Sequence, residues 1–133
     1  MKPITDYLKA NEQRFIDELI EYLRSPSVSA QSVHQKDMTA CARWLADHSK
    51  AIGLKVKVHK TDGHPIVTLA TPRKRNSNKP HFLVYGHYDV QPPEPLKLWD
   101  SPPFEPEIRG RNLYARGASD NKGQHFAHLK AVA

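Results

Sequence analysis

Two short stretches of this sequence are apolar without a period-two alternation, and they constrain the fold more than any other feature. They are Ile66-Val67-Thr68-Leu69-Ala70 and Phe82-Leu83-Val84-Tyr85. Continuous apolar strands are typical of the middle of an α/β sheet, where both faces of the strand are covered. We therefore expect an α/β fold with a mixed, largely buried sheet and helices on both of its faces.

Apolar side chains at three-to-four spacing predict three helices. These helices cover residues 5–23, 35–52 and 121–133. Thr5 or Asp6 is the expected N-cap of the first helix, and Gly53 is a suitable residue just past the end of the second. The third pattern has no terminating glycine or proline and is still apolar at its last residues. It predicts that the sequence is the front part of a longer protein.

The remaining segments read as strands and loops. Residues 54–60 alternate between apolar and polar, which predicts a strand with one solvent-exposed face. Residues 107–109 and 112–115 flank Gly110-Arg111 and predict a short hairpin. Six of the 11 prolines fall between residues 92 and 106, which predicts a long, stiff loop.

The charge balance is basic, with 20 Lys and Arg against 14 Asp and Glu in 133 residues and a formal net charge of +6. This length is enough for one globular domain. The positive charge is scattered except at Arg73-Lys74-Arg75, which lies in a polar stretch bounded by prolines. No aromatic residues interleave with this run, as they do in single-strand binders, so a solvated loop is favoured over a nucleic-acid site.

Cys41 is the only cysteine, which excludes an internal disulfide and a cysteine-rich zinc module. A metal in this chain would have to be held by histidines and carboxylates. No apolar run approaches the roughly 20 residues of a membrane-spanning helix, and the first residues do not resemble a secretory signal. We therefore expect a cytoplasmic location.

The first segment that carries chemistry is Gly86-His87-Tyr88-Asp89, at the end of the second apolar run. Ligands of open α/β sheets bind at the carboxyl ends of such strands. Side chains two residues apart in an extended chain point to the same side, so His87 and Asp89 can approach each other. The pair suits a metal-ligating histidine supported by a carboxylate, but it also suits a hydrogen-bonded pair that stabilises a turn.

The second segment covers residues 115–123, between the predicted hairpin and the last helix. Asp120 is well placed to be the N-cap of that helix. Because Gly117 and Gly123 permit close approach of the backbone, the turn could instead present Asp120 to a metal ion. The two roles do not exclude each other.

Together these segments resemble the dinuclear zinc exopeptidase family of carboxypeptidases, aminoacylases and dipeptidases, and most closely its carnosine-dipeptidase-like branch. The resemblance lies in Gly86-His87-Tyr88-Asp89-Val90-Gln91-Pro92, in Trp99-Asp100-Ser101-Pro102-Pro103-Phe104, and in Gly110-Arg111-Asn112-Leu113-Tyr114-Ala115-Arg116-Gly117-Ala118-Ser119-Asp120-Asn121-Lys122-Gly123. It extends over essentially the whole chain. It implies a zinc-dependent metallopeptidase that hydrolyses dipeptides or small acylated amino acids.

Carried over by position, the resemblance implies that His87 ligates one zinc ion. It also implies that Asp89, a member of the catalytic site, orients His87 by a hydrogen bond without contacting the metal. Asp120 would bridge two metal ions, with manganese or cobalt as alternatives to zinc. Such a pair shares a water molecule, lowers its pKa and polarises the scissile carbonyl. Asn121 stands where a second acid is often found, so we expect no more than a tuning role for it.

The resemblance also implies that residues 1–133 are the N-terminal part of the catalytic domain. The general-base glutamate, the other metal ligands and the inserted lid and dimerisation domain would then follow residue 133. Glu105 and Glu107 precede Asp120 and do not replace them. We therefore expect the 133-residue chain alone to be inactive, to bind metal weakly or not at all, and to self-associate. The whole protein is expected to be a homodimer that acts on small peptides, away from nucleic acid and membranes.

His125 and His128 share one side of the last helix and could bind a metal, but packing or solvated histidines are the favoured interpretation. The same holds for the other histidines outside the motif, which are His34, His48, His59, His64 and His81. Two functions of other classes remain open. One is a metal- or peptide-binding module without catalysis, and the other is a nucleic-acid binder that uses Arg73-Lys74-Arg75.

Overall fold

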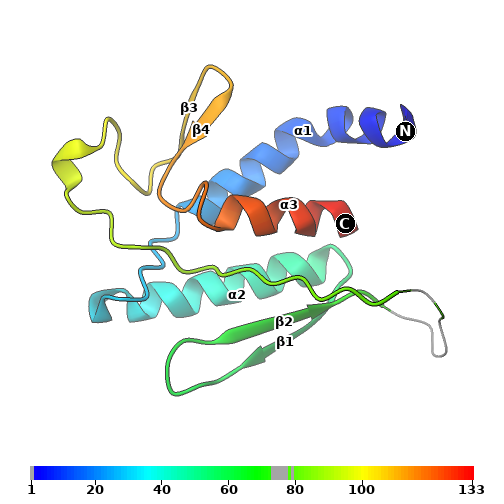
Figure 1. The fold of residues 1–133 in the computed structure, drawn as a ribbon, viewed down its shortest axis with the longest axis horizontal. Coiled ribbons are helices and arrows are strands. Elements are labelled where there is room, and N and C mark those ends of the chain that lie inside the picture. The colour runs from blue at the N-terminus through cyan, green and yellow to red at the C-terminus, as the bar shows by residue number, and fades with distance from the viewer. Residues whose placement is uncertain (1, 73–77, 79) are drawn as a thin grey trace.

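A computed structural model describes residues 2–72, 78 and 80–133 of the chain (Figure 1). Its helices are α1 (Lys2–Leu23), α2 (Gln35–Ala51) and α3 (Lys122–Val132), with short 3₁₀ turns at Ser32–His34 and Leu96–Leu98. Its strands are β1 (Lys55–His59), β2 (Ile66–Ala70), β3 (Glu107–Arg109) and β4 (Asn112–Tyr114). The mixed helix and strand content of the predicted fold class is confirmed. None of the described helices is both long and apolar enough to cross a membrane.

For the first two helices, three of the four predicted ends are confirmed to within one residue. Helix α1 ends at Leu23, and α2 begins at Gln35 and is followed by Gly53 with φ +89°, a conformation that suits glycine after a helix. The start of α1 differs from the prediction. The helix begins at Lys2, so Thr5 and Asp6 lie inside it and neither is its N-cap. Pro3 fits this earlier start because the first turn of a helix has no need of a proline N–H.

Strands β1 and β2 form an antiparallel hairpin in which Val56 pairs with Leu69 and Val58 with Val67. Val56, Val67 and Leu69 pack against the core, while the residues between them on β2 are exposed. The prediction that β2 is buried on both faces is therefore wrong. This sheet has two strands and rests on α2, which covers one of its faces (Figure 1).

The strand predicted at residues 82–85 does not form. These four residues carry no strand assignment, and their exposed fractions run from 58% for Val84 to 96% for Leu83. A strand that is apolar on both sides needs a neighbouring strand for its backbone and a cover for each face. Among the described residues nothing supplies either, so the apolar run stays extended and exposed.

The core lies where the three helices meet. Helix α2 lies between the β1–β2 hairpin and the pair formed by α1 and α3 (Figure 1). The buried cluster consists of Tyr22, Cys41, Leu45, Leu54, Phe126 and Leu129. The Trp44 ring packs against this cluster and stacks on the Tyr22 ring with 4.8 Å between centroids. The β3–β4 hairpin is confirmed as well, with Gly110 at φ +63° in its turn.

Candidate metal centre

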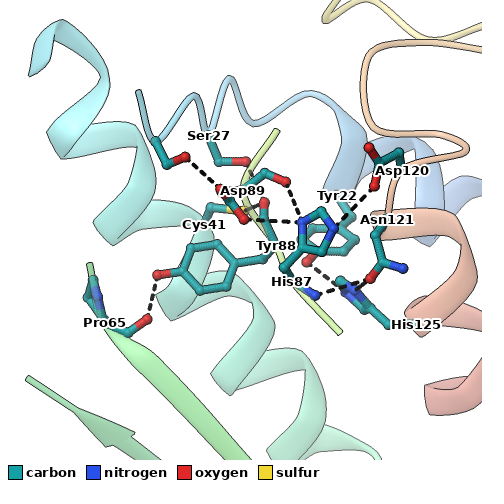
Figure 2. A network of polar contacts seen from close by, with 11 residues as sticks. Tyr22, Ser27, Cys41, Pro65, His87, Tyr88, Asp89, Asp120, Asn121 and His125 are labelled. Carbon is teal, nitrogen blue, oxygen red and sulfur yellow. Dashed lines mark hydrogen bonds and ion pairs between the residues drawn. The ribbon is translucent and has the colours of Figure 1, made fainter. Parts of the chain in front are cut away.

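The three residues singled out by the sequence come together at one place (Figure 2). His87 Nδ1 lies 3.1 Å from Asp89 Oδ1, and His87 Nε2 lies 3.1 Å from Asp120 Oδ1. The expectation that His87 and Asp89 approach each other is thus met. The imidazole therefore lies between two carboxylates, one on each ring nitrogen.

The segment that carries Asp89 is held by the chain that follows α1. Val90 N–H donates to the Ser27 carbonyl at 2.9 Å, and the Ser27 hydroxyl donates to the Tyr88 carbonyl at 2.7 Å. Ser29 Oγ donates to Asp89 Oδ2 at 2.5 Å. Both oxygens of Asp89 are therefore engaged, one with Ser29 and one with His87, which fixes the carboxylate behind the imidazole.

Asp120 reaches the site from the turn before α3. The N-cap position of that helix is Asn121, so the prediction that Asp120 caps α3 is wrong. Gly117 makes this turn feasible because it adopts φ +84° and lies so close to Val90 that a Cβ would stand 2.7 Å from Val90 Cγ1. The side chain of Asp120 is 76% exposed and points at His87.

The structure brings three further residues to the site: Asn121, for which the sequence predicted at most a tuning role, His125, for which it favoured a packing or solvated role, and Tyr22, which it did not indicate. Asn121 Oδ1 accepts from the backbone N–H of His87 at 3.1 Å and lies 3.3 Å from His125 Nδ1. His125 Nε2 in turn lies 2.8 Å from the Tyr22 hydroxyl. A polar residue next to Asp120 and a histidine one helical turn later were visible signals, but their contacts depend on a segment 34 residues away.

Burial sets the protonation of the groups around the centre. Burial lowers the pKa of His125 to about 4, so the ring is neutral near pH 7. Burial also raises the pKa of Tyr88 to about 12, with Cys41 and Asp89 adding smaller effects of the same sign, and the phenol donates to the Pro65 carbonyl at 2.6 Å. The pKa of Tyr22 is raised well above its usual range for the same reason.

Lowering the pH should destabilise the fold through His125. The folded-state pKa of about 4 lies below the ordinary 6.5, so the unfolded chain binds a proton first as the pH falls. The contribution of His125 to the free energy of unfolding is fully present above about pH 6.5 and is lost as the pH falls towards 4. The loss between pH 7 and pH 5 is about 2 kcal/mol. His48, whose pKa burial also lowers, adds to the loss with the same sign.

Urea unfolding at the two pH values measures this loss. His125→Phe should flatten the dependence on pH, whereas the control His128→Phe, on the exposed side of the same helix, should retain it. An unchanged slope in His125→Phe would contradict the assignment.

The donor set fits a metal ion of the zinc type. Nitrogen and oxygen ligands lie about 2.0–2.2 Å from zinc, so two ligands of one tetrahedral ion stand about 3.3 Å apart. The 3.1 Å between His87 Nε2 and Asp120 Oδ1 is close to that separation. Within the described ranges, no group of three His, Cys, Asp or Glu side chains is placed to hold a metal. The geometry of the pair is therefore compatible with two ligands of such a site, with Asp89 hydrogen-bonded to the imidazole.

The remaining candidates lie away from the centre. Glu107 binds Arg109 within the β3–β4 hairpin, with 2.7 Å between Oε2 and Nη2. His34 contacts Asp37, His48 contacts Lys130, His59 contacts Thr68 and His64 contacts the Ser29 carbonyl, while His81 and His128 are exposed. Arg73-Lys74-Arg75 lies outside the described residues.

Residues 83–133 match the model of "Peptidase family M20/M25/M40". The chain is 32% identical over 127 residues to a cysteinylglycine-S-conjugate dipeptidase of Corynebacterium striatum, covering 94% of this chain and 27% of that protein. It is 56% identical over 59 residues to a succinyl-diaminopimelate desuccinylase of Methylococcus capsulatus, covering 44% of this chain and 16% of that protein. The chain thus spans about a quarter or less of these relatives.

Solved structures of peptidases share the fold. A family M20 metallo-carboxypeptidase from Sulfolobus solfataricus superposes with a TM-score of 0.78 at 39% identity, over 89% of this chain and 26% of that one. Human carnosine dipeptidase 1 superposes with a TM-score of 0.81 at 24% identity, over 98% of this chain and 30% of that one. The predicted fold class, a part of an α/β catalytic domain of this family, is confirmed by these matches.

Proposed function

Because this chain belongs to peptidase family M20/M25/M40, we propose that it forms part of a zinc-dependent metallopeptidase that hydrolyses the amide bonds of dipeptides or small acylated amino acids. The observation that carries the proposal is the placement of His87 between Asp89 and Asp120. In metal sites, a ligating imidazole usually donates its second ring N–H to a carboxylate. Here Asp89 is that carboxylate, and Asp120 lies at the other ring nitrogen.

In this proposal each residue has a defined task. His87 would hold one zinc ion through Nε2, and Asp120 would serve as a carboxylate ligand that two ions share. Asp89 keeps the hydrogen of His87 on Nδ1, which leaves Nε2 free to ligate, and Ser29 holds Asp89 in turn. When bound, zinc lowers the pKa of a water molecule and polarises the substrate carbonyl.

The names of the relatives support two substrate classes. One relative is a dipeptidase and another is a desuccinylase, so a small peptide and a succinylated amino acid are the compounds to assay. We further propose that residues 1–133 are the N-terminal part of the catalytic domain, and that the whole protein is a cytoplasmic homodimer that supplies the other metal ligands. The buried free thiol of Cys41 is compatible with a reducing compartment.

A zinc titration of the chain, followed by NMR of the histidine rings, tests the proposal. We expect a weak site, because a catalytic zinc normally has at least three protein ligands and this pair offers two. The resonances of the His87 ring should shift with zinc, and the shift should disappear in Asp120→Ala. His81→Ala, which removes an exposed histidine, is the matched control. A tight site that survives His87→Ala would contradict the proposal and direct attention to His125 and His128.

The exposed run at residues 82–85 should make the chain self-associate. Phe82, Leu83 and Tyr85 are each at least 79% exposed, and their backbone is free of strand partners in the described part of the chain. Extended apolar segments of this kind pair with other chains. Light scattering at increasing concentration should show dimers or larger species, and Leu83→Lys should reduce them. A monomer at high concentration would contradict this expectation.

A further inference from the structure

A buried polar pair lies behind the candidate metal centre. The Tyr22 hydroxyl is 2.8 Å from His125 Nε2, although 103 residues separate the two. Tyr22 is fully buried and His125 is 9% exposed, so their hydrogen-bonding groups face the protein interior. The contact joins the end of α1 to the first turn of α3 (Figure 2).

The backbone N–H of His87 determines the direction of each hydrogen bond in this cluster. An N–H group can only donate, so the Asn121 atom that faces it at 3.1 Å is the side-chain oxygen. That oxygen can only accept, so His125 Nδ1, at 3.3 Å, carries a hydrogen. The other nitrogen of the neutral ring is then bare and accepts from the Tyr22 hydroxyl.

Close packing leaves the His125 ring little freedom. A Cβ added at Gly86 would lie 2.6 Å from His125 Cβ, so the backbone before His87 passes directly over the histidine. Tyr22, which contacts His125 Nε2, is itself held in place because its ring is stacked against Trp44 with an interplanar angle of 7°. A small displacement of either ring would therefore be transmitted to the backbone at residues 86–87.

We propose that His125, held by Tyr22, is a positioning residue for His87 and Asp120: its Nδ1–H orients Asn121, whose side-chain oxygen anchors the backbone of His87 and whose backbone follows Asp120. The inference rests on the proposed function, in which His87 and Asp120 are the metal ligands. These two residues come from loops 33 residues apart. Asn121 Oδ1 links the second loop to the backbone of His87, in addition to the contact of Asp120 with the His87 ring, and metal sites tolerate displacements of only about 0.5 Å.

This role differs from metal ligation by His125 itself. Both ring nitrogens of His125 are engaged within the protein, Nδ1 with Asn121 and Nε2 with Tyr22. His128, its neighbour on the helix, is exposed and lies outside the cluster. The two histidines therefore do not form a site together.

The tautomer of His125 is the first test. Long-range ¹H–¹⁵N NMR of the 133-residue chain at pH 7 should show a neutral ring with its hydrogen on Nδ1. Tyr22→Phe, which keeps the stacked ring and removes the donor to Nε2, should lower the population of this tautomer. A ring with its hydrogen on Nε2, or one unaffected by Tyr22→Phe, would overturn the proposal.

Amide hydrogen exchange is the second test. His125→Phe should speed the exchange of the His87 amide about tenfold, the effect of one lost hydrogen bond, while amides of the β1–β2 hairpin keep their rates. His125→Asn should restore slow exchange at His87, because the asparagine N–H₂ replaces Nδ1–H. His128→Phe is the matched control. Equal acceleration at the hairpin and at His87, without rescue by asparagine, would indicate a merely structural role and overturn the proposal.

Measuring zinc binding distinguishes a failure of this inference from a failure of the proposed function on which it rests. In the zinc titration, His125→Phe should weaken zinc binding about tenfold. This is the size of effect seen when a residue that orients the metal ligands, without touching the metal, is removed. If the His87 ring does not respond to zinc in the unaltered chain, the proposed function fails, while the tautomer and the amide exchange still decide whether His125 positions His87. If zinc binds and His125→Phe leaves the affinity unchanged, the function stands and the inference fails.

Discussion

Assayed alone with added zinc, the 133-residue chain should show no measurable hydrolysis of a cysteinylglycine S-conjugate or of succinyl-diaminopimelate. The proposed ligands His87 and Asp120 have no third His, Cys, Asp or Glu beside them in the described parts of the chain. Asp89 also contacts His87, but its oxygens are engaged with His87 and Ser29. Among the described residues, no third His, Cys, Asp or Glu stands beside this pair to take the proton from an attacking water, and the loss of a general base costs about 10²–10⁴-fold in rate.

Product release measured by chromatography, against a full-length relative such as the C. striatum dipeptidase, checks this result. His87→Ala in the 133-residue chain is the control, because any residual rate that it leaves unchanged arises elsewhere. Turnover equal to that of the relative, and abolished by His87→Ala, would show that these residues suffice for catalysis.

Lys122→Ala should lower the free energy of unfolding by at least about 3 kcal/mol, the amount expected for two hydrogen bonds from a charged donor before the cavity left by the side chain is counted. Lys122 is fully buried, and its Nζ donates to the Tyr22 carbonyl at 3.2 Å and to the Ser25 carbonyl at 2.8 Å. These carbonyls lie at the C-terminal end of α1, where a cation is favourable. The same Nζ is 4.9 Å from the centre of the Tyr22 ring.

Urea unfolding measures this effect. Lys122→Met keeps most of the packing and removes the ammonium, whose pKa burial lowers, so it should cost less than Lys122→Ala. Lys60→Ala, at an exposed position, should leave the stability within about 0.5 kcal/mol of the parent chain. If Lys122→Ala lowers the free energy of unfolding no more than Lys60→Ala does, the buried ammonium does not stabilise the packing of α3 on α1.

The sequence alone determined the features that depend on near neighbours. The end of α1, the span of α2 with Gly53 behind it and the turn at Gly110 follow from apolar spacing and from conformations that glycine favours. The approach of His87 to Asp89 follows from the two-residue period of an extended chain. Each of these needs only a few consecutive residues, so each could be predicted.

Tertiary structure decided the features that need distant partners. The run at residues 82–85 has the composition of a buried strand, but strand formation requires hydrogen-bond partners from another segment, and the described residues provide none. Asp120 could have capped α3 by its local sequence, yet it faces His87, 33 residues earlier. Asn121 belongs to the motif around Asp120, but Tyr22 and His125 lie outside any motif. They acquire a role because packing brings α1 and α3 together behind His87, and spacing along one chain does not encode that contact.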